Sequence, residues 1–98
     1  MEFAKNAAMS DPQSSAAHIA LSYAQQAHFN IKSAMESVQK AIEIDPKNAL
    51  AWARLAELRL SMGYLDKALE EAKKAANLKP SLARIQTVLG FAYLTQIK

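Results

Sequence analysis

The sequence predicts an all-α fold built from repeated pairs of antiparallel helices. Alanine supplies 20 of the 98 residues, whereas valine and isoleucine together supply only 8, a balance that favours helix over sheet. The three prolines, Pro12, Pro46 and Pro80, are spaced by 34 residues. A fixed period between about 20 and 50 residues is typical of a solenoid, in which each unit packs on its neighbours.

The 34-residue period extends well beyond the prolines. Segment 7–12 aligns with 41–46 and with 75–80, and each begins with alanine and ends with proline. Other positions recur with the same spacing: Leu21, Leu55 and Leu89; the small residues Ser22, Ala56 and Gly90; and Ala34 with Ala68. We therefore predict four segments. Residues 1–14 are the tail of a preceding second helix (Phe3 to Ser10) with its linker. Residues 15–48 and 49–82 are two repeat units, and residues 83–98 are the first helix of a further unit.

Each unit is predicted to hold two helices. In the central unit the first is expected near 49–62 and ends around Gly63, since glycine readily adopts the left-handed conformation of a helix end. The second is expected near 65–78 and ends before Pro80, which disfavours helix in the preceding residue. A last helix is expected over 82–98. Polar side chains suited to N-capping precede the first helices: Ser14, Asn48 and Ser81.

The two helices of the central unit differ in polarity. The first is apolar over most of its surface, with a narrow polar sector at Arg54, Glu57 and Ser61, so we expect it to lie between neighbours. The second carries an alanine- and leucine-rich stripe opposite a charged face, so we expect it to form an outer wall. Recurring alanines such as Ala34 and Ala68 allow paired helices to approach closely.

These residues resemble the tetratricopeptide repeat (TPR), a family with a 34-residue unit. The central unit matches its loose pattern at Trp52, Leu55, Ala56, Gly63, Ala68, Ala72, Ala75 and Pro80. The resemblance implies a right-handed superhelical solenoid, of which 98 residues hold about 2.9 units as a fragment of a longer array. It also implies a protein–protein interaction scaffold that binds a peptide or helix of a partner in a concave groove.

The sequence departs from the family pattern at several positions. His18 and Gln86 stand where the pattern prefers tryptophan, and Gln25 and Arg59 stand where it prefers tyrosine. We expect the aliphatic stem of Arg59 to pack while its guanidinium reaches water. Phe29 replaces the glycine between the two helices of its unit, so a different turn is expected there.

The resemblance places residues of the first helices along the concave groove. These candidate partner-binding residues are Ile19, Tyr23, Gln26, Leu50, Ala53, Arg54, Glu57, Ser61, Arg84, Thr87 and Phe91, with Leu60 and Val88 at further groove positions. Tyr23 and Phe91 are candidate aromatic anchors. Arg54 and Arg84 are candidates to bind a carboxylate. We therefore expect a protein or peptide partner with an apolar segment and an acidic residue.

Other interaction modes have weaker support in the sequence. One TPR subgroup clamps the C-terminal carboxylate of chaperone tails with lysine and asparagine, but Ile19 and Tyr23 occupy the first two of those positions. The main alternative is self-association through the end helices, because the last helix carries apolar residues such as Leu94 and Ile97 with no following helix to cover them. Helical-repeat RNA binding is a remote alternative, since the net charge is only +3 and basic residues are interspersed with acidic ones.

No catalytic, metal or cofactor site is predicted, and we do not expect an enzyme. His18 and His28 have no aspartate or glutamate four residues away, whereas a zinc site needs convergent ligands. The chain has no cysteine, and its two glycines form no phosphate-binding loop. No signal-peptide pattern is present, and no apolar run approaches the ~18 residues that span a bilayer. These absences favour a cytoplasmic location and no membrane partner.

Overall fold

The computed structural model describes residues 14–97, which form five α-helices and no strand. The helices are α2 (Ser15–Ala27), α3 (Ile31–Ile44), α4 (Ala49–Met62), α5 (Leu65–Leu78) and α6 (Ala83–Leu94). The predicted all-α fold class is confirmed, and α4 and α5 have the bounds expected for the central unit. The helix expected over Phe3 to Ser10 lies outside the described residues.

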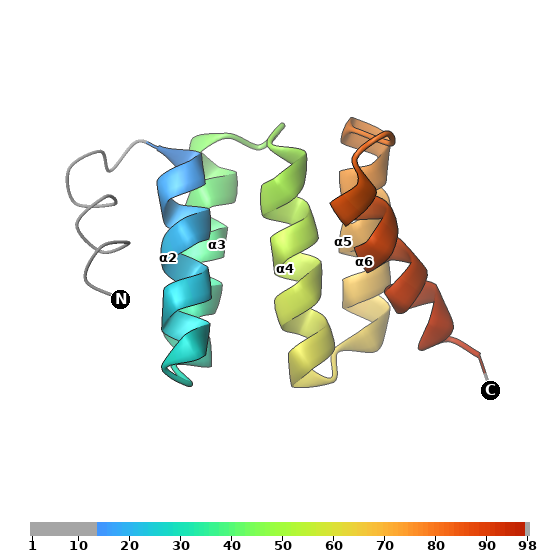
Figure 1. The fold of residues 1–98 in the computed structure, drawn as a ribbon, viewed down its shortest axis with the longest axis horizontal. Helices are drawn as coiled ribbons and strands as arrows, with labels where there is room; N and C mark the ends of the chain where they lie inside the picture. The colour runs from blue at the N-terminus through green and yellow to red at the C-terminus, as the bar shows by residue number, and fades with distance from the viewer. Residues whose placement is uncertain (1–13, 98) are drawn as a thin grey trace. The chain divides into compact units, whose positions relative to one another are not determined.

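The chain divides into two compact units, residues 1–46 and 47–98. In the first unit, α2 packs against α3. In the second unit, α4 packs against α5, and α6 packs against both of them (Figure 1). Each unit thus contains one tightly connected helix pair, and the second unit adds a further helix to its pair.

Two of the three predicted N-caps are confirmed. The Ser14 hydroxyl accepts the backbone N–H of Ala17 at 3.1 Å, and the Asn48 side-chain oxygen accepts that of Leu50 at 3.2 Å. The prediction for Ser81 is wrong, because Leu82 occupies the N-cap position of α6 without a side-chain cap. Leu82 packs against the buried cluster of the second unit, so apolar packing rather than a polar cap holds this helix start.

The last helix is shorter than predicted. It ends at Leu94, and the following backbone N–H groups bond three residues back: Gln96 donates to Tyr93, and Ile97 donates to Leu94. The Thr95 hydroxyl also donates to the carbonyl of Ala92 at 2.6 Å. Side-chain bonds of this kind compete with the helical ladder, which accounts for the early end.

The turns within the two helix pairs are the same, so the expectation of a different turn at Phe29 is wrong. Gly63 has φ 85° and Phe29 has φ 61°, both in the left-handed region. The backbone bonds match as well: Tyr64 N–H donates to Arg59 O at 2.9 Å, and Asn30 N–H donates to Gln25 O at 2.8 Å. A phenylalanine therefore adopts a conformation that normally favours glycine.

This turn yields a matched pair of stability predictions. We expect Phe29→Gly to raise the free energy of unfolding by about 1 kcal/mol, because glycine avoids the left-handed penalty and the Phe29 side chain is 92% exposed. Gly63→Ala should lower the free energy by a similar amount, because nothing lies within 4 Å of an added Cβ and only the backbone penalty remains. Urea denaturation measures both; effects of equal sign would contradict the shared turn.

Alanine contacts dominate the paired helices. Ala34, Val38 and Ala41 of α3 are fully buried, and so are the residues one period later: Ala68, Ala72 and Ala75 of α5. In the second unit these alanines join a core with α4 and α6, whose buried residues form two clusters: Ala49, Ala53, Ala75 and Ile85; and Ala56, Ala72, Val88 and Ala92. The helices of each pair therefore pack mainly through close approach at small residues.

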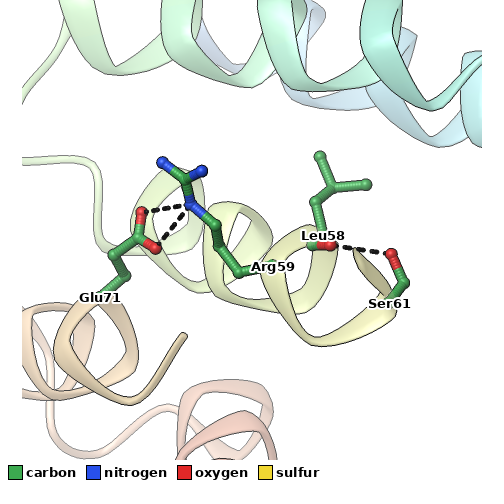
Figure 2. A network of polar contacts seen from close by, with 4 residues as sticks. All are labelled: Leu58, Arg59, Ser61 and Glu71. Carbon is green, nitrogen blue, oxygen red and sulfur yellow. Dashed lines mark hydrogen bonds and ion pairs between the residues drawn. The ribbon is translucent and has the colours of Figure 1, made fainter. Parts of the chain in front are cut away.

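A polar bridge links the helices of each pair at equivalent positions. In the second unit, Arg59 Nε lies 3.0 Å from Glu71 Oε1 (Figure 2). In the first unit, the hydroxyl of Ser37 donates to Gln25 Oε1 at 2.7 Å. Gln25 stands 34 residues before Arg59, and Ser37 stands 34 residues before Glu71. The expectation that the Arg59 guanidinium reaches water needs correction, since its side chain is mostly buried against Glu71.

The Arg59–Glu71 bridge has a pH consequence. Burial raises the pKa of Glu71 above its ordinary 4.5, and the negative charge of Glu70 adds to this rise. The positive charges of Arg59 and Lys67 lower the pKa but do not cancel the rise. A carboxyl with a raised folded-state pKa holds its proton more tightly when folded, so its contribution to stability declines as pH rises past 4.5.

We therefore expect Glu71→Gln to make the free energy of unfolding fall less steeply as pH rises above 4.5. Urea denaturation across a pH series measures the slope. Glu36→Gln, on the exposed face of α3 and away from this bridge, is the matched control. An unchanged slope in Glu71→Gln, or an equal change in both variants, would contradict the assignment.

Candidate partner-binding cleft

A cleft of about 480 Å³ lies between α4 and α6 of the second unit. Its lining residues are Glu57, Leu60, Ser61, Thr87, Val88 and Phe91. The α4 residues are spaced three and four apart, and so are Thr87 or Val88 and Phe91 of α6, so each helix presents one face to the cleft. All six were among the groove positions implied by the family resemblance.

The cleft has an apolar base and an aromatic rim. Val88 is buried and also belongs to the core cluster with Ala56 and Ala92, so the base is fixed by the packing of α6. Leu60 is half-buried. Phe91 is 63% exposed at the edge. An apolar side chain that enters the cleft would therefore contact buried Val88 below and the accessible Phe91 ring beside it.

The two hydroxyl groups of the lining are oriented by their own helices. Ser61 donates to the carbonyl of Leu58 at 2.8 Å (Figure 2), and Thr87 donates to that of Ala83 at 3.0 Å. A hydroxyl that donates its proton still has oxygen lone pairs to accept with. The hydroxyls therefore suit a ligand that offers N–H donors, such as a peptide backbone.

Charged residues flank the cleft on one side. Arg84 Nη2 lies 3.0 Å from Glu57 Oε1, and both side chains are partly exposed. Burial raises the pKa of Glu57, and the charge of Arg54 opposes that rise. Burial likewise lowers the pKa of Arg54, and Glu57 opposes that effect. One carboxylate is thus shared by two guanidinium groups, which leaves a net charge of +1 in this cluster.

The remaining α4 candidates differ in accessibility. Leu50 is exposed. Ala53 is fully buried and packs in the cluster with Ala75 and Ile85, so its methyl group belongs to the core rather than to a groove surface. Arg54 is only 2% exposed, so its charge acts on Glu57 rather than directly on a partner.

The other three predicted residues lie in the first unit. Ile19, Tyr23 and Gln26 are spaced four and three apart on one face of α2. Tyr23 is exposed, whereas Ile19 and Gln26 are half-buried. The first unit thus offers one accessible aromatic side chain at the expected helix face.

The sequence did not indicate the ion pair between Glu57 and Arg84. These residues lie 27 positions apart on different helices, and Arg84 was expected to receive a partner's carboxylate. The pairing depends on how α6 crosses α4, for which the sequence has no local signal.

Within residues 14–97, no group of three or more histidine, aspartate or glutamate side chains could hold a metal ion. No helix in this part of the chain is long and apolar enough to cross a membrane.

The charge cluster yields a direct test. Arg54→Gln should raise the pKa of Glu57 further, because the Arg54 charge is what opposes the effect of burial. The carboxyl ¹³C shift of Glu57, followed through a pH titration, measures the change. Lys79→Gln removes an equal charge from an exposed site outside the cleft and should leave the pKa of Glu57 unaltered. A pKa that stays constant in Arg54→Gln would contradict the assignment.

Paired antiparallel helices with a 34-residue period define a helical-repeat protein. The sequence model of the tetratricopeptide repeat family matches residues 26–90, and the chain belongs to this family. No curated protein matches the chain by sequence.

Several solved structures are similar in fold, and some of them are TPR domains. The crystal structure of MamA shares 29% identity with a TM-score of 0.80, covering 97% of this chain and 56% of MamA. The Sgt2 TPR domain from Aspergillus fumigatus shares 21% identity with a TM-score of 0.85, covering 97% of this chain and 64% of that one. The second TPR domain of human RPAP3, in complex with the HSP70 peptide SGPTIEEVD, shares 20% identity with a TM-score of 0.78. The match covers 94% of this chain and 77% of that domain's chain. The chain spans little more than half the length of the MamA structures it matches.

Proposed function

We propose that this chain is a protein-interaction module that binds an extended peptide or a helix of a partner in the α4–α6 cleft. The observation that carries the proposal is the cleft itself, which combines an apolar base, an exposed aromatic rim and hydroxyl acceptors. Solved relatives with the same fold hold short peptides: one RPAP3 domain binds the HSP70 peptide SGPTIEEVD, and another binds the HSP90 peptide SRMEEVD. Those complexes support peptide binding as the mode.

The cleft favours a partner segment with an apolar side chain and a nearby acidic residue. The apolar side chain packs on Leu60, Val88 and Phe91, while backbone N–H groups donate to Ser61 and Thr87. The acidic residue pairs with Arg84. Because the Arg84–Glu57 pair is partly exposed, it contributes at most about 1 kcal/mol, and a partner carboxylate can exchange with Glu57 at little cost.

Binding through an internal segment fits this chain better than binding of a C-terminal carboxylate. The clamp of the chaperone-binding TPR subgroup requires lysine and asparagine at positions where this chain has Ile19 and Tyr23. We instead propose that Tyr23, the exposed aromatic residue of α2, is a contact residue of the first unit by itself.

Peptide selection tests the proposal. Random 12-residue peptides displayed on phage are selected on the immobilised chain, and enriched peptides are measured by fluorescence anisotropy. We expect enriched peptides to contain an apolar residue near an aspartate or glutamate. Phe91→Ala should weaken binding by about tenfold, the loss of ~1.4 kcal/mol expected for one anchoring contact. Arg84→Gln should weaken binding by about fivefold or less, in line with the ~1 kcal/mol limit for an exposed ion pair.

Phe29→Ala is the matched control, because it removes a more exposed phenylalanine from outside the cleft. Tyr23→Ala tests the contribution of the first unit in the same assay. Enriched peptides that bind Phe91→Ala and Arg84→Gln as tightly as the unchanged chain would refute docking in this cleft.

A further inference from the structure

Glu57 belongs both to the cleft and to the charged cluster beside it. It lines the cleft together with Leu60, Val88 and Phe91, and its carboxylate pairs with Arg84. Glu57 lies on α4 and Arg84 lies on α6, so the ion pair joins the two helices that form the walls of the cleft. A ligand carboxylate that approaches Arg84 therefore meets a carboxylate of the chain that is already in place.

The contact between Glu57 and Arg84 has the features of an ion pair that opens easily. Arg84 Nη2 lies 3.0 Å from one Glu57 oxygen and 3.4 Å from the other, so both of these bonds are to one nitrogen. The strongest arginine–carboxylate pairs instead use two parallel N–H bonds. The side chain of Arg84 is 49% exposed and that of Glu57 is 29% exposed, so water competes for the contact. Replacement of Glu57 by another carboxylate therefore costs little.

Arg54 gives Glu57 a second cationic neighbour. It precedes Glu57 by one turn of α4 and is almost fully buried. Burial raises the pKa of Glu57 and the charge of Arg54 opposes that rise, so Arg54 acts on this carboxylate in addition to Arg84. When a ligand displaces Glu57 from Arg84, the carboxylate still lies near a positive charge. The exchange therefore avoids the penalty of an unpaired, partly buried charge.

We propose that Glu57 is an internal competitor for Arg84, which makes tight binding conditional on two groups of the ligand. This inference rests on the proposed docking in the α4–α6 cleft. A carboxylate alone exchanges one exposed ion pair for another and gains little. A carboxylate linked to an apolar side chain also gains contacts with Leu60 and Phe91, and the link raises its effective concentration at Arg84. The cleft thus selects an acidic residue beside an apolar one and discriminates against acidic segments that lack the apolar residue.

Glu57→Asp removes the competitor from Arg84 without a change of net charge. Aspartate is one methylene shorter, so it keeps its charge near Arg54 on the same helix but falls short of Arg84 on α6. Glu57→Gln also removes the competitor, but it leaves the buried Arg54 without this carboxylate neighbour and is expected to be less stable. Glu70→Gln removes one negative charge from the exposed face of α5 and controls for the effect of charge alone.

Hydrocinnamate and its amide are the probes, because they share a phenyl ring and differ only in the carboxylate. Each is titrated into the full chain, and the backbone NMR shifts of Ser61 and Val88 give its Kd. The ratio of the two Kd values, amide over acid, measures the acid preference. We expect Glu57→Asp to raise this ratio about three- to fivefold, the range of an exposed ion pair, and Glu70→Gln to leave it unaltered. Addition of Arg84→Gln to Glu57→Asp should abolish the rise.

An acid preference that Glu57→Asp leaves unaltered or lowers, or that Glu70→Gln raises equally, would overturn the role of Glu57 as a competitor. Acetate that binds the unchanged chain as tightly as hydrocinnamate would also overturn it, since the carboxylate alone would then displace Glu57. The amide tests the cleft separately, because its Kd should weaken in Phe91→Ala and stay constant in Glu57→Asp. An amide that binds Phe91→Ala as tightly as the unchanged chain would instead refute docking in the cleft.

Discussion

The close approach of paired helices at alanine is the constraint on which the rest of the structure depends. Helix axes lie about 8–10 Å apart according to the side chains between them, so Ala68, Ala72 and Ala75 bring α5 close to α4. Alanine buries little apolar area, and a pair built this way gains from a further helix. In the second unit α6 supplies it through Ile85 and Val88.

The cleft follows from that packing. Val88 is part of the core and also forms the base of the cleft, so the position of the cleft is fixed by the residues that hold α6 on α4. Its polar groups are largely satisfied within the chain, since the hydroxyls donate to their own helices and Glu57 pairs with Arg84. In the proposed binding mode, selectivity would therefore depend on exchange of existing contacts rather than on unpaired charge.

The sequence predicted most of what repeats and missed the contacts that do not. The period located both helix pairs, their alanine contacts and the cap at Asn48, because each follows from local spacing. It failed at Phe29, where the backbone bonds of the turn impose a left-handed residue regardless of its type. It also could not show that Ala53 is buried or that Glu57 pairs with Arg84. Both depend on the path of α6 across α4, which no spacing along one helix encodes.

The polar bridges distinguish one helix pair from the other. The alanine surfaces of α3 and α5 are nearly interchangeable, so apolar packing alone would allow either to pair with α2 or with α4. Exchange would place Arg59 opposite Ser37 and would leave its guanidinium mostly buried without a carboxylate, which is costly. Each bridge therefore makes the native helix pair more stable than the exchanged pair. This difference disfavours domain swapping in a chain of similar repeats.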